Sequence, residues 1–118
     1  MSKRSTKRTN YARGTEIERR IIKELKNKGY IAVRTAGSHS PFDIISFNEK
    51  HTLLIQSKRT KKQINIDSVY KEELETLNQI VDKLPEGVQV EFWLYQDRKG
   101  FVEKRILKHA HKKGLAAS

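Results

Sequence analysis

The stretch SPFDIISFNEKHTLLIQSKRTKK, residues 40–62, places polar side chains inside the most apolar part of the chain. Asp43 opens one apolar run, and Gln56 and Lys58 close the next one. If the two runs are strands of one hairpin, their ends meet across the sheet and Asp43 faces the region of Gln56 and Lys58. Strand alternation also puts Gln56 and Lys58 on one face. The pattern therefore predicts a polar site at the rim of the core.

A helix that precedes the hairpin supplies a second carboxylate. The segment TEIERRIIKELKNKG begins at Thr15, which suits an N-cap, and ends at Gly29. On a helical wheel of about 100° per residue, Glu18 falls within the apolar arc that starts with Ile17. Burying a carboxylate is costly unless a cation or donors compensate for it. Glu18 is therefore a candidate for the same site, and the alternative is a carboxylate stabilised by the helix dipole.

Two carboxylates, an amide oxygen and a lysine together suit one kind of chemistry. Carboxylate and amide oxygens are hard ligands for Mg²⁺ or Mn²⁺. A lysine beside them positions a water and stabilises charge that develops on a phosphate. The chain has 25 Lys and Arg against 14 Asp and Glu, a net charge of +11, which suggests a nucleic-acid partner. The combination predicts metal-assisted hydrolysis of nucleic acid.

The order of these residues resembles that of the PD-(D/E)xK nuclease superfamily, with PFD and IQSK as its two parts here. More narrowly, residues 14–62 resemble the archaeal-type Holliday junction resolvases. That family opens with a glycine and an E-R pair on its first helix, and continues with R-x-x-G-S, a D before apolar residues, and E-x-K with a basic stretch. The second half of the chain agrees only in its coarse order of helix and strands.

The resemblance implies a structure-selective, metal-dependent DNA endonuclease that hydrolyses phosphodiester bonds in four-way (Holliday) junctions. It implies Mg²⁺ as the cofactor, with Mn²⁺ as a substitute, and Glu18, Asp43, Gln56 and Lys58 as the catalytic residues. Asp43 corresponds to the main metal ligand, and Lys58 corresponds to the catalytic lysine that orients the attacking water. The ligand set would be completed by Glu18, by the amide oxygen of Gln56 and by the backbone carbonyl of Ser57.

DNA contacts are expected at seven further positions. Arg19, Arg34 and Ser38 match positions that the family uses at or near the phosphate. The basic clusters of the chain add the remaining four, which are Arg13, Arg59, Lys61 and Lys62.

One position departs from the family pattern, because Gln56 stands where the family usually has glutamate. An amide keeps a ligand oxygen but loses the negative charge, so metal affinity should weaken or the burden should shift to Glu18. Two alternatives therefore stay open. The first is another PD-(D/E)xK nuclease that acts on duplex or flapped DNA, and the second is a degenerate, non-catalytic DNA-binding protein.

The elements that must position these residues predict an α/β fold. The expected architecture is a restriction-endonuclease-like mixed β-sheet flanked by helices, in the order α-β-β-β-α-β-β. The expected strands lie in residues 30–38, 42–47, 52–58, 88–96 and 100–107, and the second helix runs from Asp67, its expected N-cap, to Leu84. Domain boundaries are predicted as a flexible basic N-terminal arm (1–13), a nuclease domain (14–107) and a basic, frayed C-terminal tail (108–118).

Composition narrows the setting and the partners. The chain has no cysteine, which excludes a disulfide framework and a thiolate zinc site. It has no long apolar segment for a bilayer, and its N-terminus has no hydrophobic core typical of a secretory signal. We expect branched DNA as the partner, a cytoplasmic, DNA-associated location, and neither a membrane nor a small-molecule cofactor. Because a junction must be cut on two symmetric strands, we also expect a C₂ homodimer.

Overall fold

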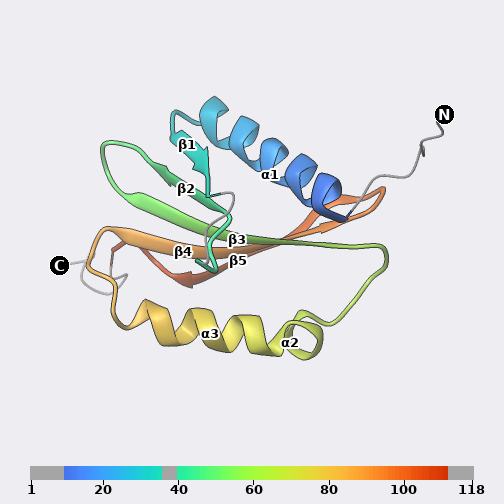
Figure 1. Ribbon diagram of the computed structural model, residues 1–118. Helices are drawn as coiled ribbons and strands as arrows, with labels where there is room; N and C mark the ends of the chain where they lie inside the picture. The colour runs from blue at the N-terminus through green and yellow to red at the C-terminus, as the bar shows by residue number, and fades with distance from the viewer. Residues whose placement is uncertain (1–9, 36–39, 112–118) are drawn as a thin grey trace.

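Five strands form one sheet in the computed structural model, which describes residues 10–35 and 40–111 (Figure 1). The strand order is β1-β2-β3-β4-β5, and only the β3–β4 pair is parallel. The mixed sheet and the predicted order of elements are confirmed. The strands are β1 (Ile31–Arg34), β2 (Ile44–Phe47), β3 (Thr52–Thr60), β4 (Val88–Gln96) and β5 (Gly100–Lys108).

Helices cover both faces of the sheet. Helix α1 (Asn10–Asn27) lies over one face, and α2 (Ile66–Val69) and α3 (Lys71–Val81) lie under the other (Figure 1). The α1 side is a buried cluster that includes Ile21, Ile55 and Trp93, and the α3 side is a second cluster that includes Leu77 and Phe92. Because β3 and β4 carry apolar residues on both faces, they form the centre of the core. None of the helices in the described part of the chain is long and apolar enough to cross a membrane.

Helix α1 begins earlier than the sequence predicts. It starts at Asn10 instead of Thr15, so Thr15 lies inside the helix and is not its N-cap. No proline interrupts residues 10–14, and Gly14 inside a helix costs only about 1 kcal/mol relative to alanine. Residues 10–13 of the predicted arm are thus helical, whereas residues 1–9 lie outside the described chain. The predicted end is correct, because Gly29 adopts a φ of 92° that favours glycine.

The second predicted helix is two helices with a break at Tyr70. The prediction of Asp67 as N-cap is wrong, because the side chain of Asn65 accepts a hydrogen bond from the backbone N–H of Ser68 at 3.2 Å and caps α2. Asp67 lies in the first turn and binds Arg105 of β5. Tyr70 has non-helical angles (φ −112°, ψ 32°), and its ring packs against Phe92 at a centroid distance of 5.5 Å. This long-range contact accompanies the break.

The start of the predicted C-terminal tail is packed and not frayed. Strand β5 extends to Lys108, whose ammonium donates hydrogen bonds to the carbonyls of Pro85 (3.0 Å) and Val88 (2.7 Å). Ala110 is buried, and its carbonyl accepts a hydrogen bond from the Gly87 N–H at 2.6 Å. The chain therefore stays attached to the β4 end of the sheet through Ala110, and residues 112–118 lie outside the described chain.

Candidate active site

Asp43 lies directly before β2 and is held across the sheet by β3. Its backbone N–H donates to the carbonyl of Ile55 at 2.8 Å. Its carboxylate oxygen Oδ2 accepts hydrogen bonds from the backbone N–H (2.8 Å) and the hydroxyl (3.3 Å) of Ser57. Burial raises the pKa of the Asp43 carboxyl, and the Ser57 hydrogen bonds and the Lys58 charge only partly oppose that effect. The hairpin thus holds the Asp43 carboxylate in a position where nearby positive charge and hydrogen bonds do not fully compensate for its burial.

The loop that precedes Asp43 is also tied down. The Thr35 N–H donates to the Asp43 carbonyl at 3.0 Å, and the Thr35 hydroxyl donates to the carbonyl of Phe42. The Phe42 side chain is buried in the α3-side cluster, and its N–H donates to the Ser40 hydroxyl at 3.0 Å. The SPF segment therefore anchors the entry into β2, so the position of Asp43 is set by packing as well as by hydrogen bonds.

Gln56 and Lys58 lie near the end of β3, on the side of the sheet that faces α3. Gln56 is only 8% exposed, and its amide oxygen Oε1 is buried with no hydrogen-bond partner among the described residues. The Lys58 ammonium lies 3.8 Å from a carboxylate oxygen of Glu73 and 5.9 Å from the centroid of the Tyr70 ring. An orphaned buried carbonyl oxygen is costly, which makes Gln56 a site that would gain from a cation.

Glu18 is the least exposed of the three helix carboxylates, with a side chain that is 18% exposed against 37% for Glu16 and 29% for Glu24. It accepts a hydrogen bond from Nε of Arg34 on β1 at 2.8 Å. Arg34 also donates to the hydroxyl of Thr15 at 3.3 Å. The predicted metal ligand and a predicted phosphate-binding arginine are therefore paired with each other.

The four predicted catalytic residues line one pocket of about 440 Å³. Helix α1 supplies one wall, and the segment before β2 and the end of β3 supply the other. The residues that line it are Gly14, Ile17, Glu18, Ser40, Pro41, Asp43, Gln56, Ser57, Lys58 and Arg59. The structure thus brings Glu18, Asp43, Gln56, Ser57 and Lys58 together from three elements.

The donor set of this pocket fits a hard divalent cation. In the described residues no group of three His, Cys, Asp or Glu side chains could hold a metal ion. The pocket has two carboxylates, those of Glu18 and Asp43, and Gln56 adds an amide. The buried, unpartnered Oε1 of Gln56 and the half-buried carboxylate of Asp43 are nevertheless oxygen ligands of the kind that Mg²⁺ and Mn²⁺ prefer.

The predicted DNA-binding residues fall into three groups. Arg34 and Arg59 are engaged in ion pairs, Arg34 with Glu18 and Arg59 with Asp97. The exposed ones are Arg19 on α1 and Lys61 and Lys62 in the loop after β3. Ser38 and the side chain of Arg13 lie outside the described part of the structure.

Sequence reasoning missed the carboxylates that accompany two of the site cations. One guanidinium nitrogen of Arg59 lies 2.8 Å from both carboxylate oxygens of Asp97, although only Oδ2 accepts a hydrogen bond in good geometry. Glu73 lies beside Lys58. Neither pair has a local sequence signal, because Asp97 reaches Arg59 only through the parallel β3–β4 pairing and Glu73 reaches Lys58 only through the docking of α3.

Comparisons with known proteins find a family model and a solved structure that resemble this chain. Residues 9–115 match the family model of the archaeal Holliday junction resolvases (Hjc). A solved structure with a similar fold is that of Hjc, a Holliday junction resolvase from the hyperthermophile Archaeoglobus fulgidus, determined at 1.6 Å resolution. The two chains are 26% identical, the match covers 78% of this chain and 84% of that one, and the TM-score is 0.51.

Proposed function

The chain belongs to the archaeal Holliday junction resolvase family of structure-selective nucleases, and on that premise we propose that it cuts four-way DNA junctions by metal-assisted hydrolysis. Two observations support the metal dependence: Glu18, Asp43, Gln56 and Lys58 line one pocket, and the buried Oε1 of Gln56 has no hydrogen-bond partner among the described residues. Mg²⁺ is the cation we expect first, because all the available ligand atoms are hard oxygens.

Each residue has a role in this proposal. Asp43 is the main ligand, since its Oδ2 is already oriented by Ser57 and its Oδ1 is left for a cation. Glu18, the Gln56 Oε1 atom and the Ser57 carbonyl complete the set. A divalent cation held by these residues would polarise the scissile phosphate and would lower the pKa of a water. Lys58 orients the attacking water and stabilises negative charge on the phosphate as the bond breaks.

The proposal requires two of the observed ion pairs to break, the Lys58–Glu73 pair when DNA binds and the Glu18–Arg34 pair when the cation binds. Lys58 and Glu73 are separated by 3.8 Å, and both side chains are about one-third exposed, so this contact is weak. Glu18 must likewise exchange Arg34 for the cation. Arg34 would then be released toward a phosphate, which reconciles its predicted DNA contact with its pairing in the DNA-free protein.

The assembly is part of the same proposal. Cleavage of two symmetric strands calls for two sites, so we expect a C₂ homodimer. The exposed side of the later strands, with Val102 and Ile106 of β5, is one candidate surface. The β1–β2 ribbon offers another in Ile31, Val33 and Phe47, which are also exposed and of which Ile31 pairs with Phe47. An enzyme that cuts DNA acts where the DNA is, so an intracellular location remains part of the proposal.

Substitution of Lys58 tests the nuclease assignment. Lys58→Ala should abolish Mg²⁺-dependent cleavage of a four-way junction while binding of that junction stays nearly unchanged. Undiminished cleavage by the variant would remove Lys58 from the mechanism. The assay should include flapped, duplex and single-stranded DNA, because preferential cleavage of one of these would favour a different PD-(D/E)xK activity. Salt-sensitive binding with no metal-dependent cleavage of any substrate would identify a non-catalytic DNA-binding protein.

A further inference from the structure

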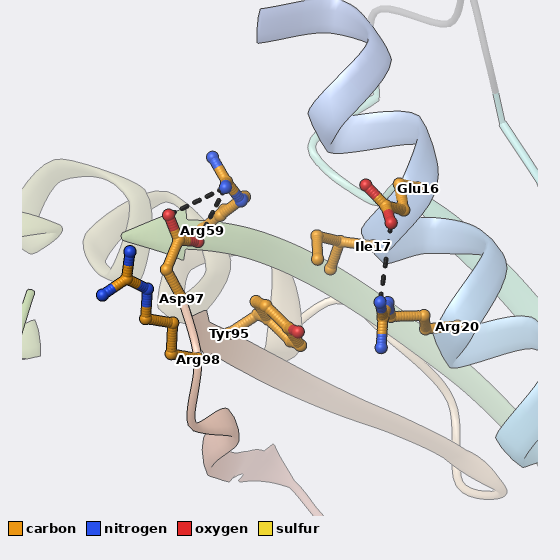
Figure 2. A pocket seen from close by; sticks show the side chains of 7 residues that line it. All are labelled: Glu16, Ile17, Arg20, Arg59, Tyr95, Asp97 and Arg98. Atoms are coloured by element: carbon orange, nitrogen blue, oxygen red, sulfur yellow. Dashed lines mark hydrogen bonds and ion pairs between the residues drawn. The ribbon is translucent and has the colours of Figure 1, made fainter. Parts of the chain in front are cut away.

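A second, smaller pocket adjoins the candidate active site and has no role in the mechanism above. Its volume is about 270 Å³, and it lies between α1 and the β4–β5 hairpin (Figure 2). It shares Ile17 and Arg59 with the active-site pocket, so the two are neighbours. Its lining residues are Glu16, Ile17, Arg20, Arg59, Tyr95, Asp97 and Arg98.

The charges in this pocket leave one arginine uncompensated by any described carboxylate. Arg59 is neutralised by Asp97 at 2.8 Å, and Arg20 lies 3.5 Å from Glu16 on an exposed helix face. The Arg20 guanidinium also lies over the Tyr95 ring, 5.4 Å from its centroid. Three arginines against two carboxylates leave 3 − 2 = +1, and Arg98 makes no ion pair with any residue in the described chain. The pocket therefore keeps an excess of positive charge.

The backbone at Arg98 is an independent sign that this side chain has a role. The Lys99 N–H donates to the Gln96 carbonyl at 3.0 Å and closes a turn in which Arg98 is the third residue. Arg98 has a φ of 69°, and no other described non-glycine residue has a positive φ. This position of such a turn favours glycine, and a side chain there costs on the order of 1 kcal/mol. Backbone strain of this kind gathers at ligand-binding segments.

We propose that this pocket binds a backbone phosphate of the DNA strand next to the scissile phosphate. Arg98 and Arg20 are the binding residues, because guanidinium groups match phosphate oxygens in a bidentate manner. The proposal rests on the proposed function, since the strand reaches this pocket from the active site that Arg59 borders. Arg20 can exchange Glu16 for a phosphate at little cost because the exposed 3.5 Å contact is weak.

The geometry of β3 explains how one strand would serve both pockets. Lys58 and Arg59 are consecutive, so their side chains leave opposite faces of β3. Lys58 leans toward Glu73 on the α3 side, and Arg59 leans toward Asp97 and the smaller pocket. A DNA strand that crosses the end of β3 would place its scissile phosphate by Lys58 and a neighbouring phosphate by Arg98 and Arg20.

The salt dependence of DNA binding tests the proposal in the full-length chain. Asp43→Asn blocks cleavage and serves as the background, to which Arg98→Gly, Arg98→Lys or Lys99→Ala is added. Glycine relieves the positive φ at residue 98, so Arg98→Gly should not lower the melting temperature. Loss of one phosphate contact should reduce the slope of log affinity against log salt by about 0.9 per site. The ratio of the DNA affinity of Asp43→Asn to that of the Asp43→Asn, Arg98→Gly double variant should therefore fall roughly threefold between about 50 and 200 mM salt.

The comparison variants distinguish phosphate binding at Arg98 from a nonspecific effect of positive charge. Arg98→Lys should keep most of the slope, and Lys99→Ala, which removes a neighbouring charge outside the pocket, should change it less than Arg98→Gly does. An unchanged slope in Arg98→Gly, or an equal loss in Lys99→Ala, would overturn the proposal. If Arg98→Gly proves unstable, Arg98→Asn replaces it, because asparagine also tolerates this backbone. Binding is measured on a four-way junction and on plain duplex DNA in parallel. Equal affinity for the two would count against the proposed function. The salt slope on duplex DNA would still test the phosphate-binding pocket.

Discussion

At the residue scale, the site is built around a carboxylate that the fold leaves poorly compensated. Asp43 is held by two hydrogen bonds from Ser57, but burial still raises its pKa. Gln56 adds a buried oxygen with no partner among the described residues. Both features destabilise the metal-free protein locally, and both would be relieved by a cation that binds the folded state.

The first prediction concerns the stability of the Asp43→Asn variant. Because the folded-state pKa of Asp43 is raised, its favourable contribution is present below the unfolded-state pKa of about 3.9 and is lost as the pH rises through the folded-state value. In metal-free buffer at neutral pH, Asp43→Asn should therefore melt at the same or a higher temperature than the parent. The difference should grow with pH across the acidic range, and thermal melting followed by circular dichroism measures it.

Mg²⁺ should reverse this order. The parent should gain thermal stability as Mg²⁺ is added, by an amount set by the ratio of free metal to its dissociation constant, and Asp43→Asn should gain little. The outcome that would remove Asp43 from the metal site is equal stabilisation of parent and variant.

The second prediction concerns Gln56. Gln56→Glu restores an acid at a ligand position, so Mg²⁺ should bind more tightly and cleavage should be retained or increased. In metal-free buffer the same variant should be less stable, because a second buried carboxylate lies near Asp43. Gln56→Leu is the matched control: it removes the unpartnered oxygen, so it should fold about as stably as the parent but cleave poorly. Loss of cleavage in Gln56→Glu would give the amide a role other than ligand.

At the element scale, periodicity and turn residues predicted the elements well because they are local properties. Gly29 ends α1 through its positive φ, as the sequence indicates. Alternation along β3 correctly puts Gln56 and Lys58 on one face. The two failures differ in kind. The cap is local, because the Asn65 side chain accepts a hydrogen bond from the Ser68 N–H while Asp67 pairs with Arg105. The break at Tyr70 accompanies a long-range contact of its ring with Phe92.

The third prediction tests that correction. Asn65→Ala removes the side-chain acceptor for the Ser68 N–H and should lower the free energy of unfolding by roughly 1 kcal/mol. Asp67→Ala should have a smaller effect that disappears in high salt, because the Asp67–Arg105 pair is exposed on the aspartate side. Chemical denaturation of both variants in low and high salt makes the comparison. A larger, salt-insensitive loss in Asp67→Ala would restore Asp67 as the cap.

The site could be predicted in part from the sequence, because strand pairing within a hairpin and helix periodicity are local properties. Asp43 directly precedes β2, and Gln56 lies on β3, the other strand of the same hairpin, so their proximity follows from local pairing. The wheel position of Glu18 predicted its lower exposure. What no local pattern predicts is the pairing of Arg34 with Glu18 and of Arg59 with Asp97, since each joins elements that meet only in the folded sheet.

At the scale of the whole molecule, the candidate active-site pocket and the adjoining basic pocket are both lined by residues 14–20 of α1. A four-way junction presents two equivalent strands, so a single chain can cut only one of them at a time. If two chains act as a C₂ dimer, the two cuts are made within one bound complex, and the products are two nicked duplexes.

The fourth prediction follows from that symmetry and does not depend on which surface forms the dimer. When the parent protein is mixed with a large excess of Asp43→Asn chains and allowed to exchange, nearly every parent chain should have an inactive partner. Such mixed dimers should nick one strand of a junction and rarely cut both. A cruciform plasmid distinguishes the outcomes, because a single nick relaxes it to an open circle and paired cuts linearise it. If linear product per parent chain is unaffected by the excess, then each chain cuts independently and the dimer is not the cutting unit.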